Sequence, residues 1–250
     1  MNKRYFAFSI ITVVLISIAV ITFSIRGISK PVVAPPTGIS LIELFTSEGC
    51  SSCPKADKTV AEIQEQYKDN VLVLCYHVDY WDHLGWKDAF SSHENTERQE
   101  YYAKVLHINS TYTPQAVVNG KEEFVGSEKS NLLSAINKSS INRVSTLQLK
   151  AMQKGNNIEV NYTAGKANVN EKMVLFLVQM QATTKVGNGE NGGRTLSHIN
   201  IVREFVQVPK GKKHVVLTLS KGNKAEYFVA GFVQNINTGE VISIGKTYIE

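Results

Sequence analysis

Two cysteines, Cys50 and Cys53, follow an apolar stretch and stand where a helical pattern begins. A cysteine in the first turn of a helix has its thiolate stabilised by unpaired backbone N–H groups and by the positive end of the helix dipole. Its pKa therefore falls below the usual value of about 8.5. A second cysteine one turn later can close a disulfide with it. The pair predicts a reactive dithiol that exchanges with thiols or disulfides of other proteins.

Two other interpretations fit the same spacing. Cys50 and Cys53 could form a permanent structural disulfide in a non-catalytic binding module. Together with His77 or His83 they could also make a soft-ligand site that delivers copper, although the spacing matches no zinc-finger pattern. For the dithiol interpretation we predict no metal and no organic cofactor, because the cysteines carry the electrons themselves. Cys75 lies inside an apolar stretch and is interpreted as an inert buried thiol.

Aromatic and acidic residues are concentrated between His77 and Trp86. This stretch follows a predicted strand, and loops at strand ends often carry binding residues. Asp79, Tyr80 and Trp81 are therefore predicted to bind substrate. In the alternative interpretation, the tryptophans pack as a lid over the sheet and the acids cap helices.

The elements that position these residues alternate between strand and helix. Residues 39–45 and 71–78 have the pattern of buried strands, and residues 50–67 between them have helical spacing. These three elements predict a parallel β-α-β unit. Further elements are expected in the order helix, strand, strand and helix, at residues 91–106, 115–118, 122–125 and from 127 onward.

This order, with the dithiol after the first strand and Thr113-Pro114 just before the third, resembles thioredoxin. Beyond residue 38, nearly the whole chain is also similar to a bacterial family of secreted proteins of unassigned function with a thioredoxin-like core. The matching stretches are ELFTSEGCSSCP from Glu43, HVDYWDHLGW from His77, YTPQ from Tyr112 and GENGGRTL from Gly189.

The resemblance implies roles for single residues. Cys50 corresponds to the attacking thiolate and Cys53 to the resolving thiol. Pro114 corresponds to a cis-proline that lies beside the dithiol and pairs with the substrate backbone, and Thr113 precedes it. Glu43, the only acid in the strand that leads to the dithiol, is expected to relay the proton of the second cysteine. The residues between the two cysteines depart from the thioredoxin pattern, so the resemblance does not imply a redox potential.

From residue 146 onward the pattern changes to strands without helices, separated by turns rich in Gly, Asn and Lys. Seven short strands predict an all-β sandwich over residues 146–250. They are expected at residues 146–152, 158–162, 173–181, 199–208, 214–219, 226–234 and 241–248. The connection 185–200 is too long for an ordinary turn, and we expect it to pack near Cys50. Its glycine-rich match to a dinucleotide fingerprint does not open a helix, so no nucleotide site is predicted.

The N-terminal residues differ from the rest. Residues 1–28 contain a long uncharged apolar run after Lys3 and Arg4, and we interpret them as a membrane anchor or signal segment. Residues 29–38 hold three of the six prolines and predict a semi-rigid linker. An α/β thioredoxin-like domain at residues 39–140 and the β-sandwich at 146–250 are expected to follow.

The net charge of +5 is unevenly distributed, because residues 39–140 are acidic and residues 141–250 are basic. This distribution does not favour a nucleic-acid partner. We therefore predict a membrane-tethered, extracytoplasmic thiol–disulfide oxidoreductase, with a cleaved secreted form as the alternative. Its predicted partners are the membrane, a protein thiol or disulfide substrate, and a redox protein that resets the dithiol.

Overall fold

The computed structural model describes residues 38–138, 141, 147–163, 168–220 and 222–250. All of them belong to one compact unit. The predicted anchor at residues 1–28, and all of the predicted linker except Gly38, lie outside the described residues. Among the residues that are described, no helix is long and apolar enough to cross a membrane.

The first half of this unit has the predicted order of strands and helices. The elements are β1 (Ser40–Thr46), α2 (Cys53–Tyr67), β2 (Val71–His77), α3 (His93–Val105), β3 (Gln115–Val118), β4 (Glu122–Val125) and α4 (Lys129–Lys138). Strands β1 and β2 pair in parallel, as expected of two strands joined by a helix, whereas β3 pairs antiparallel to both β1 and β4. The hydroxyl of Ser92 caps α3 by accepting a hydrogen bond from the Asn95 N–H.

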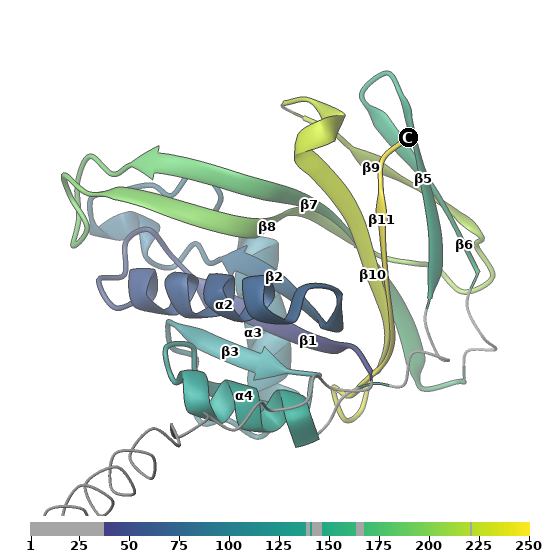
Figure 1. Cartoon of the computed structure of the whole chain (residues 1–250), viewed down its shortest axis with the longest axis horizontal. Helices are drawn as coiled ribbons and strands as arrows, with labels where there is room; N and C mark the ends of the chain where they lie inside the picture. The colour runs from purple at the N-terminus through teal and green to yellow at the C-terminus, as the bar shows by residue number, and fades with distance from the viewer. Residues whose placement is uncertain (1–37, 139–140, 142–146, 164–167, 221) are drawn as a thin grey trace, which may run out of the picture. The chain divides into compact units, whose positions relative to one another are not determined.

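The second half is built from strands, as predicted. They are β5 (Gln148–Lys154), β6 (Asn157–Thr163), β7 (Glu171–Lys185), β8 (Thr195–Gln207), β9 (His214–Thr218), β10 (Tyr227–Asn235) and β11 (Val241–Tyr248). Strands β5, β6 and β9 form a separate three-stranded sheet. The other four strands join the first half in one eight-stranded sheet with the order β11-β10-β7-β8-β2-β1-β3-β4 (Figure 1).

The predicted fold class, an α/β thioredoxin-like domain followed by an all-β sandwich domain, is therefore wrong. Strand β8 pairs with β2 at Ile201 and Cys75, so a single mixed sheet continues through both halves. The physical reason is that β2 presents an edge of unpaired backbone groups, and the long strand β8 covers it. Hydrophobic patterning identified the strands correctly but carries no information about which strand covers that edge.

The large sheet is buried on both faces. On β7, Val174 and Phe176 point to one face while Leu175 and Leu177 point to the other. The first face is continuous across both halves and packs against Tyr102 of α3. The opposite face is covered by α2 and α4 in the first half and by the three-stranded sheet in the second (Figure 1).

The β7–β8 hairpin extends from the second half toward the loop between β1 and α2 (Figure 1). The expected packing of this connection near Cys50 is confirmed, because the Asn191 side chain donates a hydrogen bond to the Cys50 carbonyl. The connecting loop is shorter than predicted, since β7 continues to Lys185 and β8 begins at Thr195. We call residues 186–194 the hairpin tip.

Candidate functional site

The dithiol lies at the junction between β1 and α2. Helix α2 begins at Cys53 and has Pro54 in its first turn, so Cys50 precedes the helix instead of opening it. Turn hydrogen bonds hold the junction, from Cys50 N–H to the Ser47 carbonyl and from Cys53 N–H to the Cys50 carbonyl, both 3.2 Å. Both cysteines are free thiols, and their exposed fractions are only 1% and 0%.

The two thiols differ in their electrostatic surroundings. A hydrogen bond from Cys53 lowers the pKa of Cys50 to about 6, and Ser52, whose Oγ lies 3.3 Å from the Cys50 sulfur, adds to this effect. Burial and the hydrogen bond to Cys50 raise the pKa of Cys53 well above its usual range. Burial also raises the pKa of Cys75, in agreement with its interpretation as an inert thiol. At neutral pH the pair therefore consists of one thiolate and one thiol.

Three of the predicted substrate-binding residues lie around the dithiol. The Thr113–Pro114 bond is cis, and the Thr113 carbonyl lies 3.8 Å from the Cys50 sulfur. The Trp81 indole N–H donates to Thr113 Oγ1 at 2.9 Å. Burial raises the pKa of Tyr80 to about 12, and the charges of both cysteines contribute to this shift.

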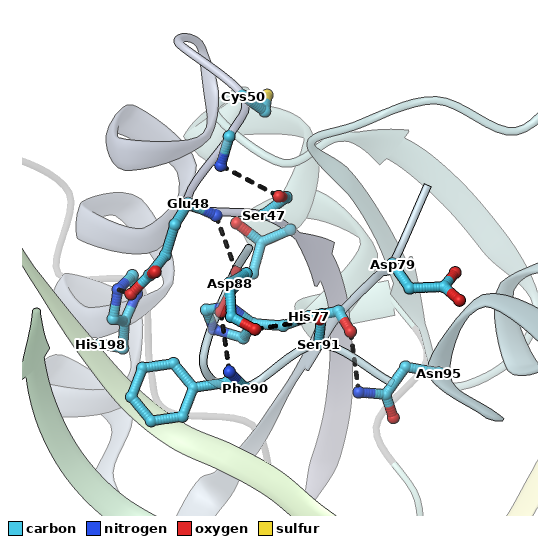
Figure 2. Close-up of polar contacts among 12 residues, drawn as sticks. Ser47, Glu48, Cys50, His77, Asp79, Asp88, Phe90, Ser91, Asn95 and His198 are labelled. Atoms are coloured by element: carbon cyan, nitrogen blue, oxygen red, sulfur yellow. Dashed lines mark hydrogen bonds and ion pairs between the residues drawn. The ribbon is translucent and has the colours of Figure 1, made fainter. Parts of the chain in front are cut away.

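Asp79, the fourth predicted substrate-binding residue, faces α3. Its carboxylate accepts a hydrogen bond from Thr96 at 2.6 Å and lies 3.1 Å from the His93 ring. Figure 2 shows Asp79 apart from Cys50. These contacts give Asp79 a role in holding α3 against the loop that follows β2.

Glu43 is buried, but on the opposite face of the sheet from α2. Its neighbours in β1, Ile42 and Leu44, pack with α2, so strand alternation turns Glu43 toward α3. There the carboxylate accepts two hydrogen bonds from Arg98, at 2.7 and 2.9 Å, and further ones from Tyr76 and Tyr102. The structure thus places Glu43 in a buried ion pair and does not bring it to the dithiol.

A different carboxylate lies on the side of the dithiol. Asp57 follows Cys53 by one helical turn, and Thr46 Oγ1 donates to its Oδ1 at 3.0 Å. Hydrogen bonding with Thr46 lowers the pKa of Cys53, whereas the charge of Asp57 raises it. Thr46 and Asp57 therefore both lie near the Cys53 thiol. The i, i+4 spacing of Cys53 and Asp57 was the sequence signal that could have identified this residue.

His198 lies on the other side of Asp57. Its Nδ1 is 3.4 Å from Asp57 Oδ2, and its Nε2 is 3.3 Å from Glu48 Oε1. Burial alone would lower the pKa of His198, but the neighbouring Asp57 and Glu48 raise it to about 9. Figure 2 shows the ring beside Glu48. His198 belongs to β8 and lies within the connection 185–200, whose length was the sequence signal that it could reach the first half of the chain.

Further buried polar residues surround Glu48. Asp88 accepts a hydrogen bond from the Glu48 N–H at 2.9 Å and contacts His77 Nδ1 at 2.6 Å (Figure 2). The Trp86 indole N–H donates to Glu48 Oε2 at 2.8 Å. His77, considered as a metal ligand, thus faces a carboxylate, and His83 is exposed. In the described part of the chain, no group of three or more His, Cys, Asp or Glu side chains is placed to hold a metal ion.

The hairpin tip holds the Cys50 loop from the other side. The buried Asn191 side chain donates to the carbonyls of Glu48 and Cys50, both at 2.9 Å. The carboxylate of Glu190 accepts a hydrogen bond from the Ser51 N–H at 2.9 Å. The long connection was the sequence signal for this contact. The tip helps to cover the dithiol, and its residues are therefore part of the site.

Comparison with known proteins gives a family and a fold. A family model described as "Protein of unknown function (DUF1223)" matches residues 41–234. An X-ray crystal structure of a protein from Agrobacterium tumefaciens is 29% identical with a TM-score of 0.62, and the match covers 84% of this chain and 93% of that one. The structure of HBP35 of Porphyromonas gingivalis has a TM-score of 0.61 at 14% sequence identity, and the match covers 86% of this chain and 76% of that one. At this identity the match indicates a shared fold alone. No curated protein matches the sequence.

Proposed function

We propose that this chain, which belongs to the DUF1223 family of proteins of unknown function, is a thiol–disulfide oxidoreductase that acts on other proteins through Cys50 and Cys53. The observation that carries the proposal is the difference between the two thiols. The pKa of Cys50 is lowered to about 6, which makes it a nucleophile at neutral pH. The pKa of Cys53 is raised, so it keeps its proton until a mixed disulfide has formed.

The exchange follows from these two protonation states. The Cys50 thiolate attacks one sulfur of a substrate disulfide, and the other substrate sulfur leaves as a thiolate. Cys53 then loses its proton to Asp57, and its sulfur attacks Cys50. The bond between Cys50 and Cys53 forms while the remaining substrate sulfur leaves as a second thiolate. The substrate is reduced by two electrons and the dithiol is oxidised. The reverse sequence oxidises a substrate dithiol, and a redox partner restores the starting state.

The low exposure of Cys50 favours substrates that present a sulfur on a flexible segment. Such a segment must pass Trp81 and the hairpin tip to reach a sulfur that is almost completely covered. The proposed location is outside the cytoplasm. It is supported by the apolar run in residues 1–28 and by the rarity of stable protein disulfides in reducing compartments.

Alkylation of the reduced protein against pH tests the nucleophile. We expect a thiol pKa of about 6 for Cys50, and the same value in Cys75→Ser, which serves as a control. Cys53→Ser should accumulate mixed disulfides with substrate proteins, whereas Cys50→Ser should form none. A pKa near that of a free cysteine would contradict the proposal.

The equilibrium reduction potential separates this function from a structural disulfide. A catalytic pair is expected to lie above about −300 mV, and a value below that limit would favour a permanent staple. Tight Cu(I) binding by the reduced protein, without disulfide exchange, would favour metal delivery.

A further inference from the structure

His198 lies beneath the dithiol although its strand, β8, belongs to the second half of the chain. We propose that His198 is a positioning residue for the dithiol. Its ring supplies the positive charge that holds Asp57 as a carboxylate, and Asp57 can then accept the proton that Cys53 must lose. This inference rests on the proposed thiol–disulfide exchange and adds a residue and a protonation state to it.

The geometry around the ring favours a positive charge. His198 Nδ1 lies 3.4 Å from Asp57 Oδ2 and Nε2 lies 3.3 Å from Glu48 Oε1, both within ion-pair distance, although neither nitrogen is in hydrogen-bond geometry with a partner among the described residues. Two buried carboxylates beside one ring favour its protonated form, because the cation offsets their negative charges. The raised pKa of His198 agrees with this form.

The surrounding charges require such a cation. His198 has a side-chain exposure of only 2%, and the carboxylates of Glu48, Asp57 and Asp88 are buried around it. The other ionisable neighbours are His77, whose ring centre lies 4.8 Å away, and Arg203, which packs over Phe90. Charges that leave water without a partner are costly, and His198 is placed between the side chains of Asp57 and Glu48 to offset negative charge there.

Asp57 and Thr46 both act on the Cys53 thiol. The Thr46 hydroxyl donates to Asp57 at 3.0 Å, and the charge of Asp57 raises the pKa of Cys53, whereas hydrogen bonding with Thr46 lowers it. Asp57 is thus near enough to the thiol to receive the proton that Cys53 releases. The S–H bond of Cys53 breaks, and its electron pair forms the bond to the Cys50 sulfur. His198 touches neither sulfur in this step and acts through Asp57.

A two-phase reaction separates this inference from the proposed function. Reduced protein is mixed with one equivalent of dithiobis(nitrobenzoate) and the release of thionitrobenzoate is followed by absorbance. The first release reports attack by Cys50, and the second reports displacement by Cys53, so Cys53→Ser should show the first phase alone. Absence of the first phase in the wild type would contradict the proposed function, whatever the role of His198.

The test of the inference is the second phase in His198→Gln. At neutral pH it should slow by about tenfold or more, a modest share of what acid–base catalysis commonly contributes, while the first phase changes by less than about twofold. The midpoint of its pH profile should also move upward. Asp57→Asn should slow the second phase to a similar extent, and adding His198→Gln to that variant should have little further effect.

A matched control removes a carboxylate from the same buried cluster. Glu48→Gln keeps the charge of His198 and should not raise the midpoint of the second phase. A structural role for His198 would reduce stability without moving that midpoint, and an unmoved midpoint in His198→Gln would overturn the inference. The ring nitrogen chemical shifts of wild-type His198 give a measurement that does not depend on folding of a variant. A neutral ring at neutral pH would also overturn the inference.

Discussion

The sulfurs of Cys50 and Cys53 lie within one turn of each other but meet different groups. Cys50 accepts hydrogen bonds that favour its thiolate, whereas Cys53 is buried against Thr46. The reactivity of the pair thus depends on a few neighbours whose replacement should have separable effects on chemistry and on stability. Each prediction at this scale uses one of those neighbours or a comparable buried charge.

The first prediction concerns Glu43. Glu43→Gln should lower the free energy of unfolding by about 3 kcal/mol or more, because it leaves the buried guanidinium of Arg98 without its counter-charge. The pKa of Cys50 should not change, since Glu43 faces α3. Urea unfolding and alkylation rates measure the two quantities. Glu62→Gln, which breaks an exposed pair with Lys129, should leave the free energy of unfolding nearly unchanged. A shifted Cys50 pKa would contradict the structural role of Glu43.

The second prediction concerns pH and stability in the reduced protein. The pKa of His198 is raised from 6.5 to about 9, so its contribution to stability is complete below pH 6.5 and is lost as the pH rises through about 9. The pKa of Cys50 is lowered from 9.0 to about 6, so its contribution is complete above pH 9.0 and is lost as the pH falls through about 6. In the wild type, the two groups therefore change the free energy of unfolding in opposite directions as the pH rises.

Removing Cys50 should reveal the pH dependence that His198 gives to the free energy of unfolding. Between pH 6.5 and 9, reduced Cys50→Ser should lose more stability than the reduced wild type, as measured by urea unfolding at each pH. Adding His198→Gln to Cys50→Ser should remove most of that loss. If the free energy of unfolding changed with pH in the same way in Cys50→Ser and in the wild type, the pKa shifts assigned to Cys50 and His198 would be wrong.

Asp57 and Glu43 show what the sequence could predict at the residue scale. The spacing of Cys50 and Cys53 identified the dithiol, because helix start signals are local. Glu43 does not reach the dithiol because parity in β1 decides which face a carboxylate occupies, and α2 covers the even-numbered face. His198 lies within the connection 185–200 that was expected to pack near Cys50, but its contact with Asp57 depends on the pairing of β8 and was not predicted.

At the scale of elements, the β7–β8 hairpin differs most from the prediction, because it joins the sheet of the first half. Its strands were predicted as runs bounded by turn-rich segments, and its tip was expected near Cys50 because of its length. The pairing of β8 with β2 was not predicted, because any exposed strand edge offers the same backbone groups. The tip holds the backbone of the Cys50 loop, and we expect it also to restrict access to the Cys50 sulfur.

The third prediction tests this restriction. In Asn191→Ala the carbonyls of Glu48 and Cys50 lose their donor. Each lost hydrogen bond of about 1 kcal/mol favours local opening by about fivefold, so Cys50 should react at least about fivefold faster with a neutral alkylating reagent. The rate should be measured at a pH at which Cys50 is fully ionised, so that a change in its pKa has no effect.

Asn188→Ala provides the matched control, because Asn188 is an exposed residue of the same tip. It should leave the alkylation rate within about twofold of the wild type, as expected of a surface substitution. Equal rates in Asn191→Ala and Asn188→Ala would show that the tip does not limit access to the sulfur.

At the scale of the whole molecule, one sheet and one continuous core face join the two halves. Arg98 of α3 donates to Gln234 of β10, and Phe45 and Phe176 belong to the same core. Periodicity predicted the order of helices and strands in each half. It could not show that the halves share a sheet, because that depends on contacts between residues far apart in the chain.

The fourth prediction is that residues 39–140 do not fold alone. Without β8, the edge of β2 and the core face around Tyr76 lose their cover, so the fragment should show no cooperative urea transition. In the intact described unit, fluorescence of Trp81 and Trp86 should change together with circular dichroism of the whole unit. A fragment with a sigmoidal transition near that of the intact chain would indicate two independent domains.

The position of His198 and Asn191 also has a consequence for biosynthesis. A ribosome makes Cys50 and Cys53 well before the hairpin, so a growing chain carries both cysteines without the residues that cover and charge-balance them. During this interval His198 and the hairpin tip are absent from the chain, and residues 39–140 are not expected to fold around the dithiol. We therefore expect the site to be completed only when the C-terminal half has been made.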